Sequence, residues 1–193
     1  MKKILLLHGA IGSQEQLEPL KIELSGKYEV HTFNFTGHGG SEIPHEPFSI
    51  EMFAGDIIDH VNSNDLAGID IFGYSMGGYA ALYAAHKNPG KIGRIFTLAT
   101  KFDWSIEIAE REVKMLDAEK IKQKVPKFAE ELSARHGADK WLTVLEKTAG
   151  MMRALGSNNL LTAETLAEIQ NEVLVGIGDS DKMVTLEETI AAY

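Results

Sequence analysis

Short apolar stretches rich in β-branched and aromatic residues recur along the chain, and segments with apolar residues three or four positions apart separate them. Apolar stretches of about four to eight residues are typical of buried strands. We expect strands at Lys2–His8, Tyr28–Phe35, Ile69–Phe72, Ile92–Ala99 and Glu172–Gly178. Helices are expected at Gln14–Leu24, Ile50–Asn62 and Met76–Lys87. Because parallel strands need crossover connections, this alternation predicts an α/β protein with a mostly parallel sheet and helices on both faces.

The alternation of strands and helices stops between the fourth and fifth expected strands, where residues 101–161 show helical periodicity and no strand. Helices are expected at Ile106–Leu116, Pro126–His136 and Asp139–Leu155, and then at Ala163–Gln170. We interpret residues 101–161 as a helical cap inserted into a core formed by residues 1–100 and 162–193. Aromatic and methionine side chains of this segment, such as Trp104 and Met151, either pack the cap or line an apolar pocket beneath it.

The sequence Gly73-Tyr74-Ser75-Met76-Gly77-Gly78 joins the third expected strand to the helix that follows it. A serine at such a sharp turn needs small residues two positions before and two positions after it, because the doubled-back chain crowds any side chain there. The turn exposes the serine hydroxyl and directs the first N–H groups of the helix at whatever the hydroxyl attacks. The strand-to-helix junction is what makes this short motif informative.

Composition restricts the classes of function. The chain has 193 residues, which favours a single domain, and its net charge is −9 with no basic cluster. Such a charge argues against binding to nucleic acid or to an anionic membrane surface. Cysteine is absent, which excludes disulfides and thiolate metal sites and is compatible with the cytoplasm, where we expect the protein. The apolar run after Lys2-Lys3 is too short for a signal peptide, and no stretch is long enough to span a membrane.

Four motifs fall at the carboxyl ends of expected strands, where parallel α/β sheets bind their ligands. They are His8-Gly9-Ala10-Ile11-Gly12-Ser13, Gly37-His38-Gly39-Gly40-Ser41, the Ser75 turn, and Gly178-Asp179-Ser180-Asp181-Lys182-Met183-Val184. Together and in this order they resemble the motifs of a small, cap-bearing α/β-hydrolase, and the resemblance extends from the first strand to Val184. It implies a serine esterase or related hydrolase that uses neither a cofactor nor a metal ion.

The resemblance also implies a role for each of four residues. Ser75 would be the nucleophile, and the N–H groups of Ala10 and Met76 would form the oxyanion hole. Asp181 would be the acid that orients and electrostatically supports a histidine. Asp179, two residues earlier in the same loop, competes for that role, and the G-D-x-D-x-x-V spacing favours the second aspartate.

The histidine of the triad is the missing part. The family places it after a further strand, downstream of the acid, whereas the last histidine here is His136 and the sequence ends at Tyr193. Three explanations are open: the natural protein continues with the last strand and the histidine, another histidine (His136 or His45) substitutes, or the chain is an inactive relative that binds a ligand or partner. The histidines of the first two motifs, at positions 8 and 38, are expected to brace their loops.

The expected chemistry is cleavage or formation of a small ester-like or related carbonyl compound through an acyl-serine intermediate. A serine at position 75 argues against the haloalkane dehalogenase and epoxide hydrolase branches, which carry aspartate there. The loop from His8 to Ser13 is similar to that of the menaquinone-pathway synthase branch, in which the triad promotes proton abstraction and elimination. This lyase chemistry is the enzymatic alternative, and an inactive binding module is the alternative from another class. The expected partner is a small-molecule substrate.

Overall fold

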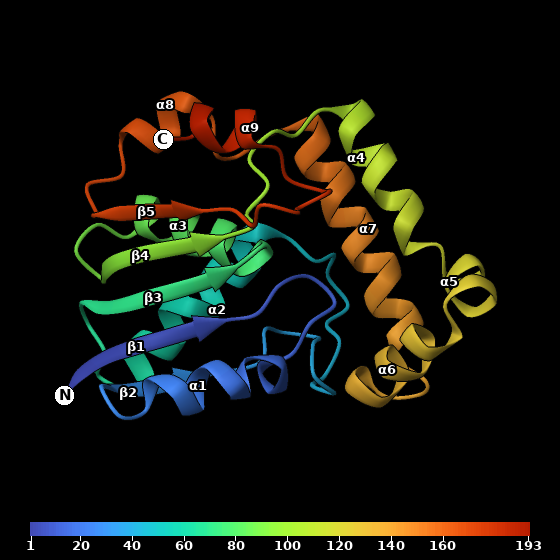
Figure 1. The fold of residues 1–193 in the computed structure, drawn as a ribbon, viewed down its shortest axis with the longest axis horizontal. Helices are drawn as coiled ribbons and strands as arrows, with labels where there is room; N and C mark the ends of the chain where they lie inside the picture. The colour runs from blue at the N-terminus through green and yellow to red at the C-terminus, as the bar shows by residue number, and fades with distance from the viewer.

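A five-stranded parallel sheet forms the centre of the computed structural model, which describes residues 1–193 (Figure 1). The strands are β1 (Lys2–Leu7), β2 (Tyr28–Thr32), β3 (Ile69–Tyr74), β4 (Ile92–Leu98) and β5 (Val173–Gly176). Their spatial order is β2-β1-β3-β4-β5, and each neighbouring pair is parallel. The carboxyl ends of all the strands therefore meet at one edge of the sheet.

Helices cover both faces of the sheet, so the α/β fold expected from the sequence is confirmed (Figure 1). α2 (Ile50–Ser63) and α3 (Met76–Lys87) pack together on one face, and the 3-10 helix η1 (Gln14–Leu17) with α1 (Glu18–Leu24) lies against β1 and β2 on the other. Two short helices accompany β5: α8 (Ala163–Ala167) and α9 (Leu186–Ala191). None of the helices combines the length and the apolar character needed to cross a bilayer.

Beyond the carboxyl edge of the sheet lies a group of helices that we call the cap, residues 101–161 (Figure 1). It contains α4 (Ile106–Val113), the 3-10 helix η2 (Lys114–Leu116), α5 (Ala118–Lys124), α6 (Pro126–His136) and α7 (Trp141–Ser157). The two ends of the cap are joined, because the Asn159 side-chain amide donates a hydrogen bond to the Phe102 carbonyl (2.8 Å). The Tyr79 hydroxyl of α3 donates in turn to the Asn159 side-chain carbonyl (2.6 Å).

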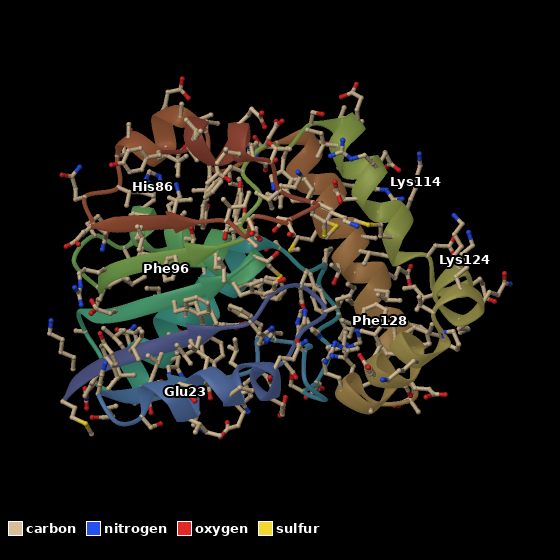
Figure 2. The ribbon with its side chains drawn as sticks, viewed as in Figure 1. Glu23, His86, Phe96, Lys114, Lys124 and Phe128 are labelled. Atoms are coloured by element: carbon tan, nitrogen blue, oxygen red, sulfur yellow. The ribbon has the colours of Figure 1, made fainter.

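The cap shares one core with the sheet and has a smaller one of its own. Val144, Met151 and Leu155 of α7 belong to the main cluster of buried side chains. The second cluster joins α5 and α6 to α7 and consists of Ile121, Leu132, Trp141 and Leu145. Figure 2 shows Phe128 among these helices and Lys114 and Lys124 on the outer side of the cap. One long helix thus attaches the cap to the main core, while α5 and α6 pack against that helix.

The two faces of the sheet differ in how completely they are covered. Ile71 and Ile95, in register on β3 and β4, are buried in the core beneath α2 and α3. On the opposite face Phe72 packs edge to face against Phe96, which Figure 2 labels, with ring centroids 5.4 Å apart, and both are only partly buried. Leu174 on the edge strand β5 is 62% exposed. The face with α1 is therefore open over β3 to β5.

Two helices were not expected from the sequence. α5 is rich in lysine and buries only Ile121, so it carries no apolar periodicity, and its start is fixed instead by the Asp117 side chain, which accepts from the Lys120 N–H (3.0 Å). α9 begins with a capping box in which Thr185 and Glu188 bond to each other's backbone N–H groups. Local capping rather than burial defines both helices.

Candidate active site

Ser75 occupies the expected sharp turn between β3 and α3, with backbone angles φ 51° and ψ −117°. A positive φ is uncommon for residues other than glycine and persists only where the surroundings hold it. Here the Ser75 N–H donates to the Leu98 carbonyl (2.8 Å), and the Ser75 carbonyl accepts from the Thr100 hydroxyl (3.0 Å). The end of β4 therefore fixes the turn that presents the serine.

The glycines on either side of the serine are required by close backbone contacts. A Cβ atom added at Gly73 would lie 2.5 Å from the backbone nitrogen of Gly78, and one added at Gly77 would lie 2.6 Å from the His8 carbonyl oxygen. Such distances cannot be relieved by a side-chain rotation, because the opposing atoms are backbone. The predicted need for small residues two positions before and after Ser75 is confirmed.

We expect Gly73→Ala to lower the free energy of unfolding by about 1–3 kcal/mol, because the new methyl group overpacks the turn. Gly55→Ala is the matched control, since a Cβ atom there meets nothing within 4 Å and the residue lies inside α2. Removing a glycine from a helix interior should stabilise the protein by about 1 kcal/mol. Urea denaturation of both variants checks the difference in sign, and equal effects would contradict this account of the turn.

Ala10 and Met76, which line the same cavity as Ser75, have backbone N–H groups without partners. The half-buried Ser75 hydroxyl makes no hydrogen bond within the protein, and neither does the Ala10 N–H. Met76 is the first residue of α3, so its N–H has no partner inside that helix. Gly9 packs closely against the turn, since a Cβ atom there would lie 3.2 Å from Ser75 Cβ. Three of the four residues predicted for the site thus lie around one point.

These three residues line a small cavity of about 50 Å³ beneath the cap. Nine of its eleven lining residues are hydrophobic. Trp104, Met151, Met152 and Leu155 come from the cap, so part of the predicted aromatic and methionine set does face the pocket. The other lining residues are Ala10, Ile50, Ser75, Met76, Tyr79, Lys101 and Met183. A hydroxyl thus faces an almost wholly apolar space with a single charged group on its wall.

The loop after β5 contains both candidate acids, and its geometry favours Asp181. Asp181 is half-buried, and its Oδ1 accepts from the N–H groups of Met183 (2.8 Å) and Val184 (2.9 Å), while its Oδ2 makes no hydrogen bond. Asp179 is exposed and bonds only to the neighbouring Ser180 hydroxyl (3.2 Å). Met183, two residues after Asp181, lines the same cavity as Ser75. The loop thus fixes one carboxylate oxygen and leaves the other available.

A buried ion pair that the sequence analysis missed holds this loop in place. Lys101 follows the end of β4, and its ammonium donates to the Met183 carbonyl (2.9 Å) and to Glu188 Oε2 (3.2 Å). The two charged side chains are 8% and 7% exposed. Glu188 also accepts from the Phe102 N–H (3.1 Å). The only available signal was the position of a lysine shortly after the end of a strand, at the sheet edge where the four motifs also lie.

The histidines of the first two motifs brace their loops, as the sequence predicts. His8 is buried, with Nδ1 donating to the Gly9 carbonyl (2.8 Å) and Nε2 accepting from the Phe35 N–H (3.2 Å). The Nδ1 atom of the buried His38 donates to the Thr36 carbonyl (3.1 Å). The bond from the Phe35 N–H requires an unprotonated Nε2 and therefore a neutral His8, whereas the Nε2 atom of His38 is buried without a partner. Burial lowers the pKa of His8 to about 4 and that of His38 to about 3.

The two histidines proposed as substitutes for the triad base occupy other settings. His136 is buried and uses both ring nitrogens, because Nδ1 accepts from the Gly39 N–H (3.2 Å) and Nε2 donates to the Ile11 carbonyl (2.9 Å). His45 is exposed, and its ring makes no hydrogen bond. Neither ring bonds to Ser75 or Asp181. A fully engaged His136 cannot act as a base without first giving up one of its bonds.

The buried histidines predict acid sensitivity of folding. Below pH 6.5 the unfolded chain protonates both residues, whereas the native protein excludes protons from His8 until about pH 4 and from His38 until about pH 3. The unfolded state therefore binds more protons, and the free energy of unfolding falls as the pH is lowered below 6.5, by up to about 1.4 kcal/mol per pH unit for each histidine. Urea denaturation from pH 7.5 to pH 5 measures this slope.

The exposed His45 provides the control for that slope. His45→Gln should leave the pH dependence unchanged, whereas His38→Gln should reduce it because one excluded proton is lost. A wild-type stability that stays flat from pH 7 to pH 5 would contradict the burial of neutral histidines.

The sequence of this chain is similar to those of known hydrolases. The sequence matches the alpha/beta hydrolase fold over residues 2–143. The chain belongs to the α/β-hydrolase fold family. The pimeloyl-[acyl-carrier protein] methyl ester esterase of Neisseria meningitidis serogroup C is 30% identical to it over 92 residues, which are 48% of this chain and 34% of that protein. The matched region is thus about a third of the length of this curated relative.

Solved α/β-hydrolase structures share the fold over almost the whole chain. The enol-lactonase of Burkholderia xenovorans LB400 superposes with a TM-score of 0.77 at 21% identity, covering 99% of this chain and 78% of its own. A hydrolase of Pseudomonas aeruginosa PA01 gives a TM-score of 0.77 at 18% identity, covering 99% and 77%. At such identities the likeness shows the fold alone, and members of this α/β-hydrolase family differ widely in what they act on.

Proposed function

We propose that this α/β-hydrolase is a serine hydrolase that cleaves a small ester or related carbonyl compound through an acyl-serine intermediate. The observation that carries the proposal is the position of Ser75, at a positive φ between β3 and α3, with the unpartnered Ala10 N–H and the first N–H of α3 around the same cavity. The esterase name of the Neisseria relative, which matches 92 residues of this chain, supports ester chemistry.

In this mechanism the Ser75 hydroxyl attacks the carbonyl carbon while the triad histidine that the family resemblance implies takes its proton. The negative charge that develops on the carbonyl oxygen is stabilised by the N–H groups of Ala10 and Met76. Collapse of the tetrahedral intermediate transfers this proton from the histidine to the leaving alcohol and leaves the acyl group on Ser75. Water, deprotonated by the same histidine, then attacks the acyl-serine, and the acid leaves as the proton returns to the Ser75 oxygen. Asp181 would orient the base through its unbonded Oδ2, with Oδ1 held by two N–H groups.

The cavity supports a short acyl group. Its volume of about 50 Å³ is roughly a third of that of an apolar cavity of ~150 Å³ that binds benzene. The apolar lining favours hydrocarbon over charged groups at the acyl end of the substrate. We therefore expect acetyl and propionyl esters to be cleaved with a higher kcat/KM than esters of eight-carbon acids.

A fluorophosphonate probe tests the proposal. Labelling should be stoichiometric, should map to Ser75 by mass spectrometry of peptides, and should be lost in Ser75→Ala. Ser180→Ala, in the exposed part of the acid loop, is the matched control and should label as the wild type does. A folded protein that the probe does not label would refute the serine hydrolase. A labelled protein that cleaves none of a panel of simple esters would favour the lyase alternative.

A further inference from the structure

The turn that contains Ala10 has an unusual backbone. The Gly12 N–H donates to the Gly9 carbonyl (3.1 Å), so Ala10 and Ile11 are the central residues of a tight turn. Ile11 adopts φ 52°, in the left-handed region that β-branched residues rarely enter. A conformation of this kind costs on the order of 1–3 kcal/mol and needs support from its surroundings.

The support comes from the end of α6 in the cap. The Ile11 carbonyl accepts two hydrogen bonds, one from Arg135 Nη1 (2.9 Å) and one from His136 Nε2 (2.9 Å). The Ile11 side chain packs against both the main core and the small core of the cap. His136 is further fixed by the Gly39 N–H, which donates to its Nδ1 (3.2 Å), so its proton lies on the nitrogen that faces Ile11.

We infer that Arg135 and His136 are positioning residues that hold Ile11 in its left-handed conformation and thereby set the orientation of the neighbouring Ala10 N–H. This inference rests on the proposed function, in which that N–H binds the oxyanion. Neither residue needs to touch the substrate. Both residues belong to the cap, so the cap does more than cover the pocket. Its two hydrogen bonds to the Ile11 carbonyl complete the oxyanion hole.

The double variant Arg135→Met/His136→Phe removes both donors while retaining apolar bulk. We expect kcat for p-nitrophenyl acetate to fall by about 10²–10³-fold, the usual effect of losing one oxyanion donor, with KM changed less than threefold. Amide hydrogens of residues 8–13 should exchange at least tenfold faster by mass spectrometry. Arg135→Lys, which keeps a donor, should retain most of the wild-type kcat.

Arg153→Met is the matched control, because Arg153 pairs with Glu110 on the exposed side of the cap and should alter neither measurement. A folded double variant with wild-type kcat, or with unchanged exchange in residues 8–13, overturns the inference. Should the double variant fail to fold, Arg135→Met alone decides by the same two measurements. If the wild type cleaves no ester, the proposed function fails. The hydrogen exchange of residues 8–13 alone then supports or overturns the role of Arg135 and His136 in holding Ile11.

Discussion

Ser75→Ala should lower kcat for ester hydrolysis by about 10⁶-fold, because loss of the nucleophile alone removes almost everything that a triad contributes. The fold should not change. The Ser75 hydroxyl makes no hydrogen bond in the protein, and alanine can occupy the same turn, which the backbone bonds to Leu98 and Thr100 hold. Steady-state kinetics with p-nitrophenyl acetate and a thermal melt measure the two properties separately.

The separation of activity from stability is the informative part of that experiment. We expect the thermal midpoint of the variant to lie within about 2 °C of the wild type, since a substitution without lost contacts has little effect. Residual hydrolysis at the wild-type rate would show that another group performs the chemistry. A large drop in stability would instead show that the hydroxyl has a structural partner.

Lys101→Met should have the largest effect on stability. Removing one partner of a buried ion pair typically costs 3–5 kcal/mol, because the other charge stays buried without compensation. Glu188 keeps the N–H groups of Phe102 (3.1 Å) and Thr185 (3.2 Å), so we expect the lower end, about 3 kcal/mol. For a protein of this size the thermal midpoint should fall by roughly 6–12 °C.

Lys120→Met is the control for that variant, because Lys120 pairs with Asp117 on the surface and should change stability by less than about 0.5 kcal/mol. Combining Lys101→Met with Glu188→Gln should recover part of the loss by removing the uncompensated charge. Equal effects of Lys101→Met and Lys120→Met would contradict a structural role for the buried pair. Lys101 also lines the cavity. Its loss should therefore destabilise both the loop that contains Asp181 and the wall of the substrate pocket.

The sheet and the serine turn could be predicted because both leave local signals. Strands such as β1 are short apolar runs between polar segments, and the turn carries glycines at positions where backbone atoms crowd any Cβ atom. Helix α5 escaped prediction because Asp117 and its hydrogen bonds define it rather than a pattern of burial. Local capping of this kind is visible in a sequence only when the residues that it serves are already known to be helical.

Contacts between distant parts of the chain could not be predicted. Arg135 and Ile11 are far apart in the sequence, and nothing around either residue indicates that a guanidinium will meet that carbonyl. Lys101 and Glu188 are similarly distant, and each is an ordinary charged residue in its own segment. Their roles depend on how α6 and the acid loop pack against the sheet, which only the folded arrangement defines.

The hydrogen bond between Asn159 and the Phe102 carbonyl brings together the points at which the chain leaves the sheet domain and returns to it. A segment whose two junctions touch can be exchanged for another of different length without moving the strands on either side. The family could therefore acquire new substrate preferences by replacing the whole insert. A chimera that joins Phe102 to Asn159 through a foreign helical hairpin should fold around an unaltered serine turn if the hairpin supplies apolar side chains in place of those that α7 contributes to the main core.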